Sequence, residues 1–319
     1  MAATLLVIAV WVGSAAVSAA THAQIRGTLA RPLNQVISPQ VQHQSYSIID
    51  LGTLGGKSST AIGINDRDWV TGVANLQGND SQHAVLWTPK EKIDLGTLGG
   101  PNSAVSWPIK ANTGAIAGIS ETSATDPLRE NFCSFGTSHI CLGFLWRNGA
   151  MLPLPTLGGN NSDATAVNDR GQVAGFAENH TRDPNCIAPQ SLDFEGVIWG
   201  PSKGQMQVLP PLAGDAVAGA AAINDSGQAV GASGICQNPS PAAHAVLWQN
   251  NSVINLGSLG GKKGNIATAI NNRGEIAGFS DLAGDDTSHA FLWRNGVMTD
   301  LGILPGDFSS AAFGINDKS

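Results

Sequence analysis

Few residues in this chain have side chains suited to chemistry, and most of those recur at one position of a repeat. His83, His244 and His289 each begin a short segment that runs through alanine and two apolar residues to tryptophan. A shared metal ion would need the three imidazoles to converge, whereas equivalent residues of successive repeats lie apart. We therefore expect each histidine to make a structural hydrogen bond to a neighbouring turn.

Acidic residues follow the repeat as well. Asp50, Asp94 and Asp300 end predicted strands, where we expect them to cap turns. Three further aspartates lie in the loop at 281–286, but they lack the alternating ligand spacing of an EF-hand. We therefore expect no calcium site in that loop.

Known catalytic motifs are absent from the sequence. It contains no Gly-x-Ser-x-Gly elbow, no His-Glu-x-x-His motif and no glycine-rich phosphate loop. A carboxylate pair for glycoside hydrolysis would come from distant positions, and no pattern selects such a pair. The sequence therefore predicts no catalytic residue, no cofactor and no metal ion.

The cysteines carry more information. Cys133, Cys141, Cys186 and Cys236 all fall in predicted loops between the second and third strands of a repeat. An even number of cysteines behind an export signal favours disulfides. Cys133 and Cys141 are close enough in sequence for a disulfide within one loop. Cys186 and Cys236 occupy equivalent loops of adjacent repeats and could form a disulfide between them. The other two ways of pairing the four cysteines stay open. Because Cys-x-x-Cys is absent, we expect no redox or zinc role.

A repeat must position these residues, and its clearest marker is tryptophan. Five of the eight tryptophans share one repeat position, and we assign them a structural role: Trp87, Trp146, Trp199, Trp248 and Trp293. They are 59, 53, 49 and 45 residues apart. A four-stranded propeller blade needs about 40–50 residues, whereas a β-helix coil needs about half that.

Each repeat contains four short strands and two tight turns. In the last complete repeat the first strand ends at 270, and the others span 275–279, 289–293 and 297–302. The Asn-Asp-x-Gly turn recurs after the first strand, and Asn-Gly joins the last two strands of two repeats. These residue types tolerate the positive φ of hairpin turns. In the first repeat Asp68 replaces the glycine.

The two ends of the array are incomplete. Residues 46–52 match a fourth strand without the preceding three, and 311–317 match a first strand without a second. We therefore predict an all-β fold over 46–319, a β-propeller of four-stranded antiparallel blades with five full blades plus a partial sixth. The strand at 46–52 would complete the last blade. The array would be truncated at its C-terminus or close imperfectly, with an exposed edge.

The N-terminal region is different in composition. Residues 5–12 form an apolar core too short to span a bilayer, and small residues follow, so we predict a signal peptide at 1–23 although no basic residue precedes the core. A polar linker follows at 24–45. We expect no membrane span after signal removal. The net charge is −7 with no run of Lys or Arg, which excludes a nucleic-acid footprint.

The combined motifs resemble the bacterial HAF repeat family, a probable extracellular repeat. The resemblance is carried by His-Ala-Phe-Leu-Trp at 289–293 and its variants at 83–87 and 244–248, and by Asp-Leu-Gly-Thr-Leu-Gly-Gly at 50–56 and 94–100. It covers the chain from Tyr46 to the C-terminus. It implies an exported protein with propeller-like repeats, and it brings no established activity and no catalytic residues.

These observations favour an exported, non-enzymatic binding or surface-structural propeller, either secreted or periplasmic in a bacterium. Its partner would be a glycan or an envelope or matrix protein. Long, non-repetitive loops on a rigid scaffold commonly carry function, which favours the cysteine-bearing loops at 121–140, 178–193 and 233–243. One alternative is a propeller polysaccharide hydrolase or lyase with its site at the mouth of the ring. Another is a truncated fragment without function.

Overall fold

The computed structural model describes residues 47–105, 107–108, 111–236 and 243–318. The signal peptide and linker predicted for 1–45 lie outside these residues. Residues from Gly52 onward belong to one compact unit that contains all of the strands described below, and residues 47–51 belong to a second unit. Within the described residues, no helix is long and apolar enough to cross a membrane.

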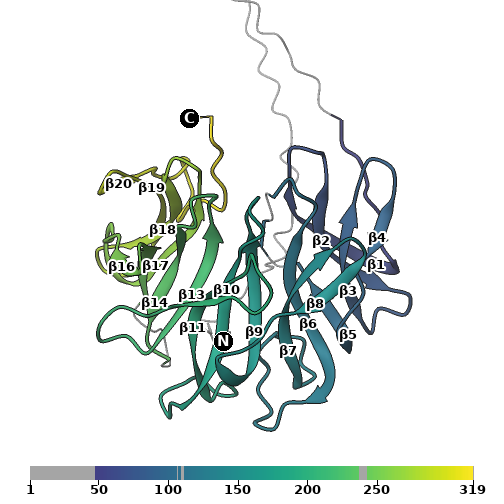
Figure 1. The fold of residues 1–319 in the computed structure, drawn as a ribbon. Helices are drawn as coiled ribbons and strands as arrows, with labels where there is room; N and C mark the ends of the chain where they lie inside the picture. Colours follow the sequence, from purple (N-terminus) through teal and green to yellow (C-terminus); the bar gives the residue numbers. More distant parts are fainter. Residues whose placement is uncertain (1–46, 106, 109–110, 237–242, 319) are drawn as a thin grey trace, which may run out of the picture. The chain divides into compact units, whose positions relative to one another are not determined.

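The strands form five antiparallel sheets of four, and in each sheet the strands pair in chain order (Figure 1). We call the sheets blades one to five. Blade one comprises β1 (Gly55–Ile64), β2 (Val70–Leu76), β3 (Gln82–Trp87) and β4 (Lys92–Asp94). Blade two comprises β5 (Gly99–Ala104), β6 (Ile116–Thr125), β7 (His139–Arg147) and β8 (Ala150–Pro153). Blade three comprises β9 (Gly158–Val167), β10 (Val173–Arg182), β11 (Leu192–Trp199) and β12 (Met206–Leu209).

The last two blades follow the same order. Blade four comprises β13 (Val217–Ile223), β14 (Ala229–Gly234), β15 (Ala243–Gln249) and β16 (Ser252–Asn255). Blade five comprises β17 (Gly260–Ile270), β18 (Ile276–Leu282), β19 (Ser288–Arg294) and β20 (Val297–Asp300). The predicted β-propeller of four-stranded antiparallel blades is therefore confirmed.

The blades pack face to face through their first strands. In blades two to five the first strand lies against the second and third strands of the preceding blade. Gly143 in β7 shows how close this approach is, because a Cβ atom there would lie 2.8 Å from the backbone nitrogen of Ala164 in β9. Small residues at these positions let the two sheets meet at van der Waals distance.

A serine hydroxyl fastens two of these junctions and also the contact between blade five and the segment that follows it. It accepts a hydrogen bond from a third-strand N–H of the preceding blade and donates one to a carbonyl in the connection that follows that blade. The N–H donors are Ala84 to Ser103 (2.9 Å), Gly143 to Ser162 (3.0 Å) and Ala290 to Ser310 (2.9 Å). The carbonyl acceptors are Gly96 (2.6 Å), Leu154 (3.2 Å) and Gly302 (2.6 Å).

Residues 302–316 take the place of a sixth first strand against blade five. The N–H of Ser310 donates to the carbonyl of Ser288 (3.0 Å), and the hydroxyl of Thr268 donates to the carbonyl of Ala312 (2.5 Å). The partial sixth blade therefore follows the path of the repeat, although it forms no regular strand among the described residues.

Blade one differs from the other blades because no described blade precedes it. Ile64 is 60% exposed, whereas its counterpart Val167 in blade three is 4% exposed. Ala61 is also exposed, although the equivalent Ala164 is buried. One blade face is therefore accessible within the described part of the chain.

The prediction of a strand at 46–52 is wrong. Residues 47–53 lie outside any strand, and Tyr46 is outside the described residues.

The two predicted turn types form as expected. In blade three the N–H of Asn168 donates to the carbonyl of Gln172 (3.0 Å), and Gly171 has φ +78°. Asp68, which replaces the glycine in blade one, adopts φ +57°. Asparagine and aspartate tolerate this left-handed conformation better than other side chains do, so the turn survives the substitution.

The serine junction predicts a difference between two equivalent serines. Replacing Ser162 by alanine leaves the buried N–H of Gly143 and the partly buried carbonyl of Leu154 without this partner, so we expect the free energy of unfolding to fall by about 1–3 kcal/mol. Ser59 holds the same position in blade one and is exposed, so Ser59→Ala should change it by less than about 0.5 kcal/mol. Urea denaturation of both variants measures this, and equal losses would contradict the role assigned to the junction.

Candidate functional site

The turns that follow the first strands meet at one end of the blades, which we call the turn end. A chain of hydrogen bonds links six of them, because each turn donates a backbone N–H to a side-chain oxygen of the next. The links are Asp66 to Asn112 (3.2 Å), Asn112 to Asp169 (2.7 Å), Asp169 to Asp225 (2.9 Å), Asp225 to Asn272 (2.9 Å) and Asn272 to Asp317 (2.8 Å). The repeated turn residues are thus held in a fixed order.

We call these six linked turns the turn ring. A second set of hydrogen bonds also joins neighbouring turns of this ring. The side-chain amide of the first asparagine in a turn donates to a backbone carbonyl of the next turn. Such bonds run from Asn65 to Ala111 (3.0 Å), Asn168 to Asn224 (2.9 Å), Asn224 to Asn271 (3.1 Å) and Asn271 to Asn316 (3.0 Å). The repeat asparagine therefore closes its own turn and also fixes the position of the neighbouring one.

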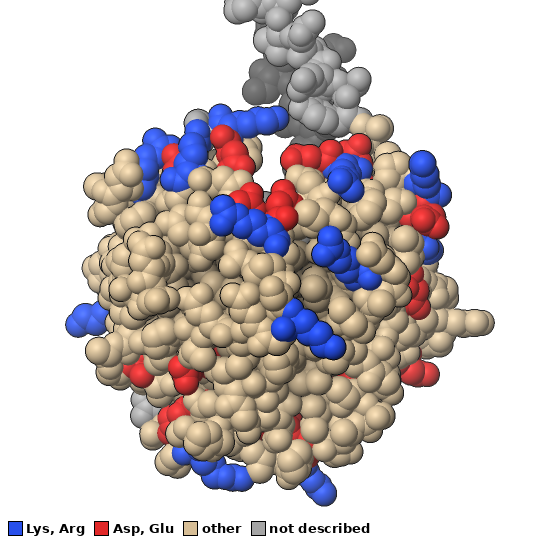
Figure 2. Space-filling view, in the orientation of Figure 1, with Lys and Arg blue, Asp and Glu red and all other residues tan. Residues whose placement is uncertain are grey.

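The turn ring surrounds a pocket of about 550 Å³. Aliphatic side chains contribute to its lining: Ile64, Val167, Ile223, Ile270 and Ile315. Four carboxylates also line it: Asp66, Asp169, Asp225 and Asp317. In Figure 2, acidic side chains gather around a hollow at the upper side of the view. The pocket thus combines apolar contact area with fixed hydrogen-bonding groups.

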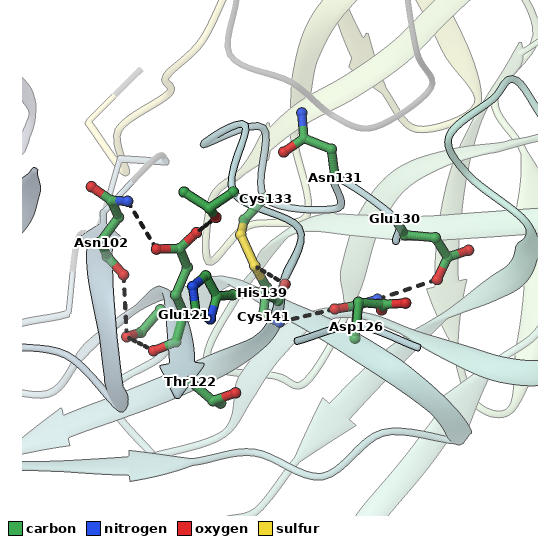
Figure 3. Close-up of a disulfide and its surroundings, with 12 residues drawn as sticks. Asn102, Glu121, Thr122, Asp126, Glu130, Asn131, Cys133, His139 and Cys141 are labelled. Carbon is green, nitrogen blue, oxygen red and sulfur yellow. Dashed lines mark hydrogen bonds between the residues drawn. A yellow bond between two sulfur atoms is a disulfide. The ribbon is translucent and has the colours of Figure 1, made fainter. Parts of the chain in front are cut away.

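The long loops between second and third strands lie at the opposite end of the blades, which we call the loop end. Cys133 in the loop of blade two pairs with Cys141, which lies in β7 and not in the loop as predicted, and Cys186 pairs with Cys236 between blades three and four. These are the pairings that the sequence spacing favoured. Figure 3 shows the first disulfide beside Glu121, whose carboxylate accepts hydrogen bonds from the Asn102 amide (2.8 Å) and the Thr137 hydroxyl.

A cluster of buried acids lies near these loops, and the sequence did not reveal it. The side-chain amide nitrogen of Asn161 lies 2.8 Å from Asp126, 3.0 Å from Glu178 and 3.4 Å from Glu130. All three carboxyl groups are at most 1% exposed. Glu130 comes from the long loop of blade two and accepts the N–H groups of Ser191 and Leu192, so it joins that loop to blade three.

Burial changes the protonation of this cluster. Loss of solvent and the nearby charge of Glu130 raise the pKa of Glu178 to about 8. Burial also raises the pKa of Glu130, although the N–H groups of Ser191 and Leu192 oppose that change. A proton held on Glu178 lets it hydrogen bond to Glu130 without repulsion between two charges. These acids therefore fasten two blades, and they are sealed from solvent.

Two other buried aspartates keep a carboxylate oxygen without a hydrogen-bond partner. Burial raises the pKa of Asp163 to about 7, and one of its oxygens is unpartnered. Asp193 also has an unpartnered oxygen, and burial together with the charges of Asp183 and Glu195 raises its pKa to about 6. No motif marks these positions in the sequence, because their environment comes from neighbouring blades.

The three repeat histidines bind single acids and do not converge. His83 and Asp94 are hydrogen bonded at 2.8 Å, and His289 and Asp300 at 2.9 Å. In blade four Asn255 replaces the repeat aspartate, and His244 instead contacts Asp215 at 3.0 Å.

The repeat aspartates also cap turns. Asp94 accepts the N–H of Gly96 (2.8 Å), and Asp300 accepts that of Gly302 (2.7 Å). The Gly302 N–H and His289 hold the pKa of Asp300 below its usual range. In the loop at 281–286, Asp281 and Asp285 accept backbone N–H groups of Gly264 and Lys262 (2.7 and 2.6 Å).

Four of the five repeat tryptophans pack in hydrophobic clusters between blades: Trp146, Trp199 and Trp248, each at most 8% exposed, and the partly buried Trp293. Trp87 is also buried, at 3% exposure. The indole N–H groups of Trp199 and Trp248 donate to the carbonyls of Pro155 (2.9 Å) and Pro210 (2.8 Å). None of these rings lines the pocket described above.

Neither a family model nor a curated protein matches the chain. Among solved structures, the β-propeller domain of the Trilobed protease from Pyrococcus furiosus aligns with 78% of this chain and 68% of its own, at 11% identity and a TM-score of 0.48. The acylaminoacyl peptidase of Pyrococcus horikoshii aligns with 76% of this chain and 39% of its own, at 8% identity and a TM-score of 0.42. An arginine-to-alanine mutant of AofleA from Arthrobotrys oligospora aligns with 80% of this chain and 74% of its own, at 10% identity and a TM-score of 0.38. The blade arrangement itself establishes the fold.

The raised pKa of Glu178 predicts that alkaline pH destabilises the protein. The folded state keeps a proton that the unfolded state releases, so this group lowers the free energy of unfolding as pH rises from about 5 to about 8. Glu178→Gln removes that contribution. The free energy of unfolding of this variant, relative to that of the wild type, should therefore rise by at least about 1 kcal/mol between these pH values. Urea denaturation at both values measures the difference. The exposed Glu91→Gln is the control, and a gain no larger than in this control would contradict the assignment.

Proposed function

We propose that this protein is an exported, non-enzymatic binding propeller whose pocket at the turn end takes a glycan. The observation that carries the proposal is the turn ring, in which equivalent residues of six repeats line one pocket of about 550 Å³. That volume falls in the usual range for small-ligand sites.

The chemistry of the lining suits a polyhydroxylated ligand. Carboxylate groups of Asp66, Asp169 and Asp225 line the pocket and accept hydrogen bonds from hydroxyl groups. The aliphatic side chains offer apolar area to the C–H faces of a sugar ring. Because hydrogen bonds between turns already fix these groups, little side-chain ordering remains to oppose binding.

The two disulfides support the proposed export. Both cysteine pairs form disulfides, which persist in oxidising compartments. The motif order shared with HAF repeats supports the same proposal, and a secreted or periplasmic location follows from it. The proposal moves the binding surface from the loop end, which the sequence favoured, to the turn end, because the ring of repeat residues and its pocket lie there.

A glycan array followed by calorimetry on the strongest hit tests this proposal. Asp169→Ala removes a ring carboxylate and the acceptor of the Asn112 N–H, so we expect binding to weaken by at least about tenfold. Asp286→Ala changes an exposed aspartate in a loop-end loop and should leave affinity unchanged. If the loop-end variant alone loses binding, the ligand lies at the loop end. If no glycan is retained, the proposed ligand class is wrong.

A further inference from the structure

Each of the two disulfides has a carboxylate beside it. The sulfur atoms of Cys186 and Cys236 and a carboxylate oxygen of Asp193 all lie within 4.8 Å of one another, and Cys133, Cys141 and Glu121 form a similar group. Two thiolates and one carboxylate are donors that zinc accepts in proteins. The sequence alone did not suggest zinc, because these cysteines are 50 residues apart and come from different blades.

The two groups differ in the hydrogen bonds that their carboxylates accept. Glu121 accepts hydrogen bonds from Asn102 and Thr137. Asp193 is 7% exposed, and one of its oxygens has no hydrogen-bond partner. Burying a carboxylate oxygen without a hydrogen-bond partner destabilises the folded state. A bound cation beside the two sulfur atoms would supply the missing partner.

We infer that, when the cross-blade disulfide is reduced, Cys186, Cys236 and Asp193 form a zinc site. The site is independent of the glycan pocket, which lies at the other end of the blades. Zinc would then link blades three and four where the disulfide links them under oxidising conditions.

Two thiol molecules of a reductant become one disulfide and pass two electrons and two protons to the Cys186–Cys236 bond, which breaks into two thiols. Zinc then displaces the two thiol protons to solvent and forms two Zn–S bonds and one Zn–O bond. Water would occupy the fourth position of a tetrahedral ion.

The test uses the full chain carrying Cys133→Ser and Cys141→Ser, so that one cysteine pair remains. After reduction with a phosphine, which competes weakly for zinc, titration with Zn²⁺ should show one ion per chain. The oxidised chain should bind none. Asp193→Asn should weaken binding by at least about tenfold, since a neutral amide is a poorer ligand than a carboxylate. Asp286→Asn is the matched control and should bind as the parent does.

A second measurement avoids dependence on variants that fold poorly. The reduced wild-type chain titrated with Co²⁺ should show the charge-transfer absorption of thiolate ligands, and this absorption should disappear on oxidation. The inference is overturned if the reduced chain binds no metal, if Asp193→Asn binds as tightly as its parent, or if binding survives when Cys186→Ser and Cys236→Ser are added to the chain that already carries Cys133→Ser and Cys141→Ser.

Discussion

The packing of each first strand against the second and third strands of the preceding blade is the constraint on which this structure depends. A single four-stranded sheet cannot bury its own faces, so burial comes only from neighbours. The contrast between Val167 at 4% exposure and Ile64 at 60% shows what a neighbouring blade contributes. Close packing requires small residues such as Gly143 and Ala164 at the contact, and the serine hydroxyl satisfies the polar groups that the contact buries.

The same packing gives the two ends of the blades different properties. At the turn end the connections of blades one, three, four and five are five residues long and follow one residue pattern, so stacking the blades places equivalent groups around one pocket. At the loop end the connections of blades one and five are equally short, but those of blades two to four are longer and differ from one another. They fasten neighbouring blades through the Cys186–Cys236 bond and through Glu130, which reaches from blade two to the backbone of blade three. The regular groups around the pocket and the irregular contacts between blades are thus at opposite ends of the strands.

The buried acids show how electrostatics limits these fasteners. Three ionised carboxyl groups around Asn161 would repel one another strongly in a medium of low dielectric constant. Retaining a proton on Glu178 removes much of that repulsion and keeps the hydrogen bonds between blades. The stability of the loop end is therefore tied to pH, whereas the turn ring depends mainly on backbone N–H donors.

The sequence by itself determined the strands, the turns and the number of complete blades. These features depend on local chemistry: positive φ at Asn, Asp and Gly, and tryptophan at one position of a four-stranded unit. It also indicated the two disulfides and the single-partner role of the histidines. It did not predict the partner of His244, because Asp215 comes from the connection before blade four. Only the tertiary structure decided the pocket, the acid cluster around Asn161 and the environment of Asp193. Each brings together residues from different blades, and their burial and pKa depend on distances between blades that no local pattern encodes.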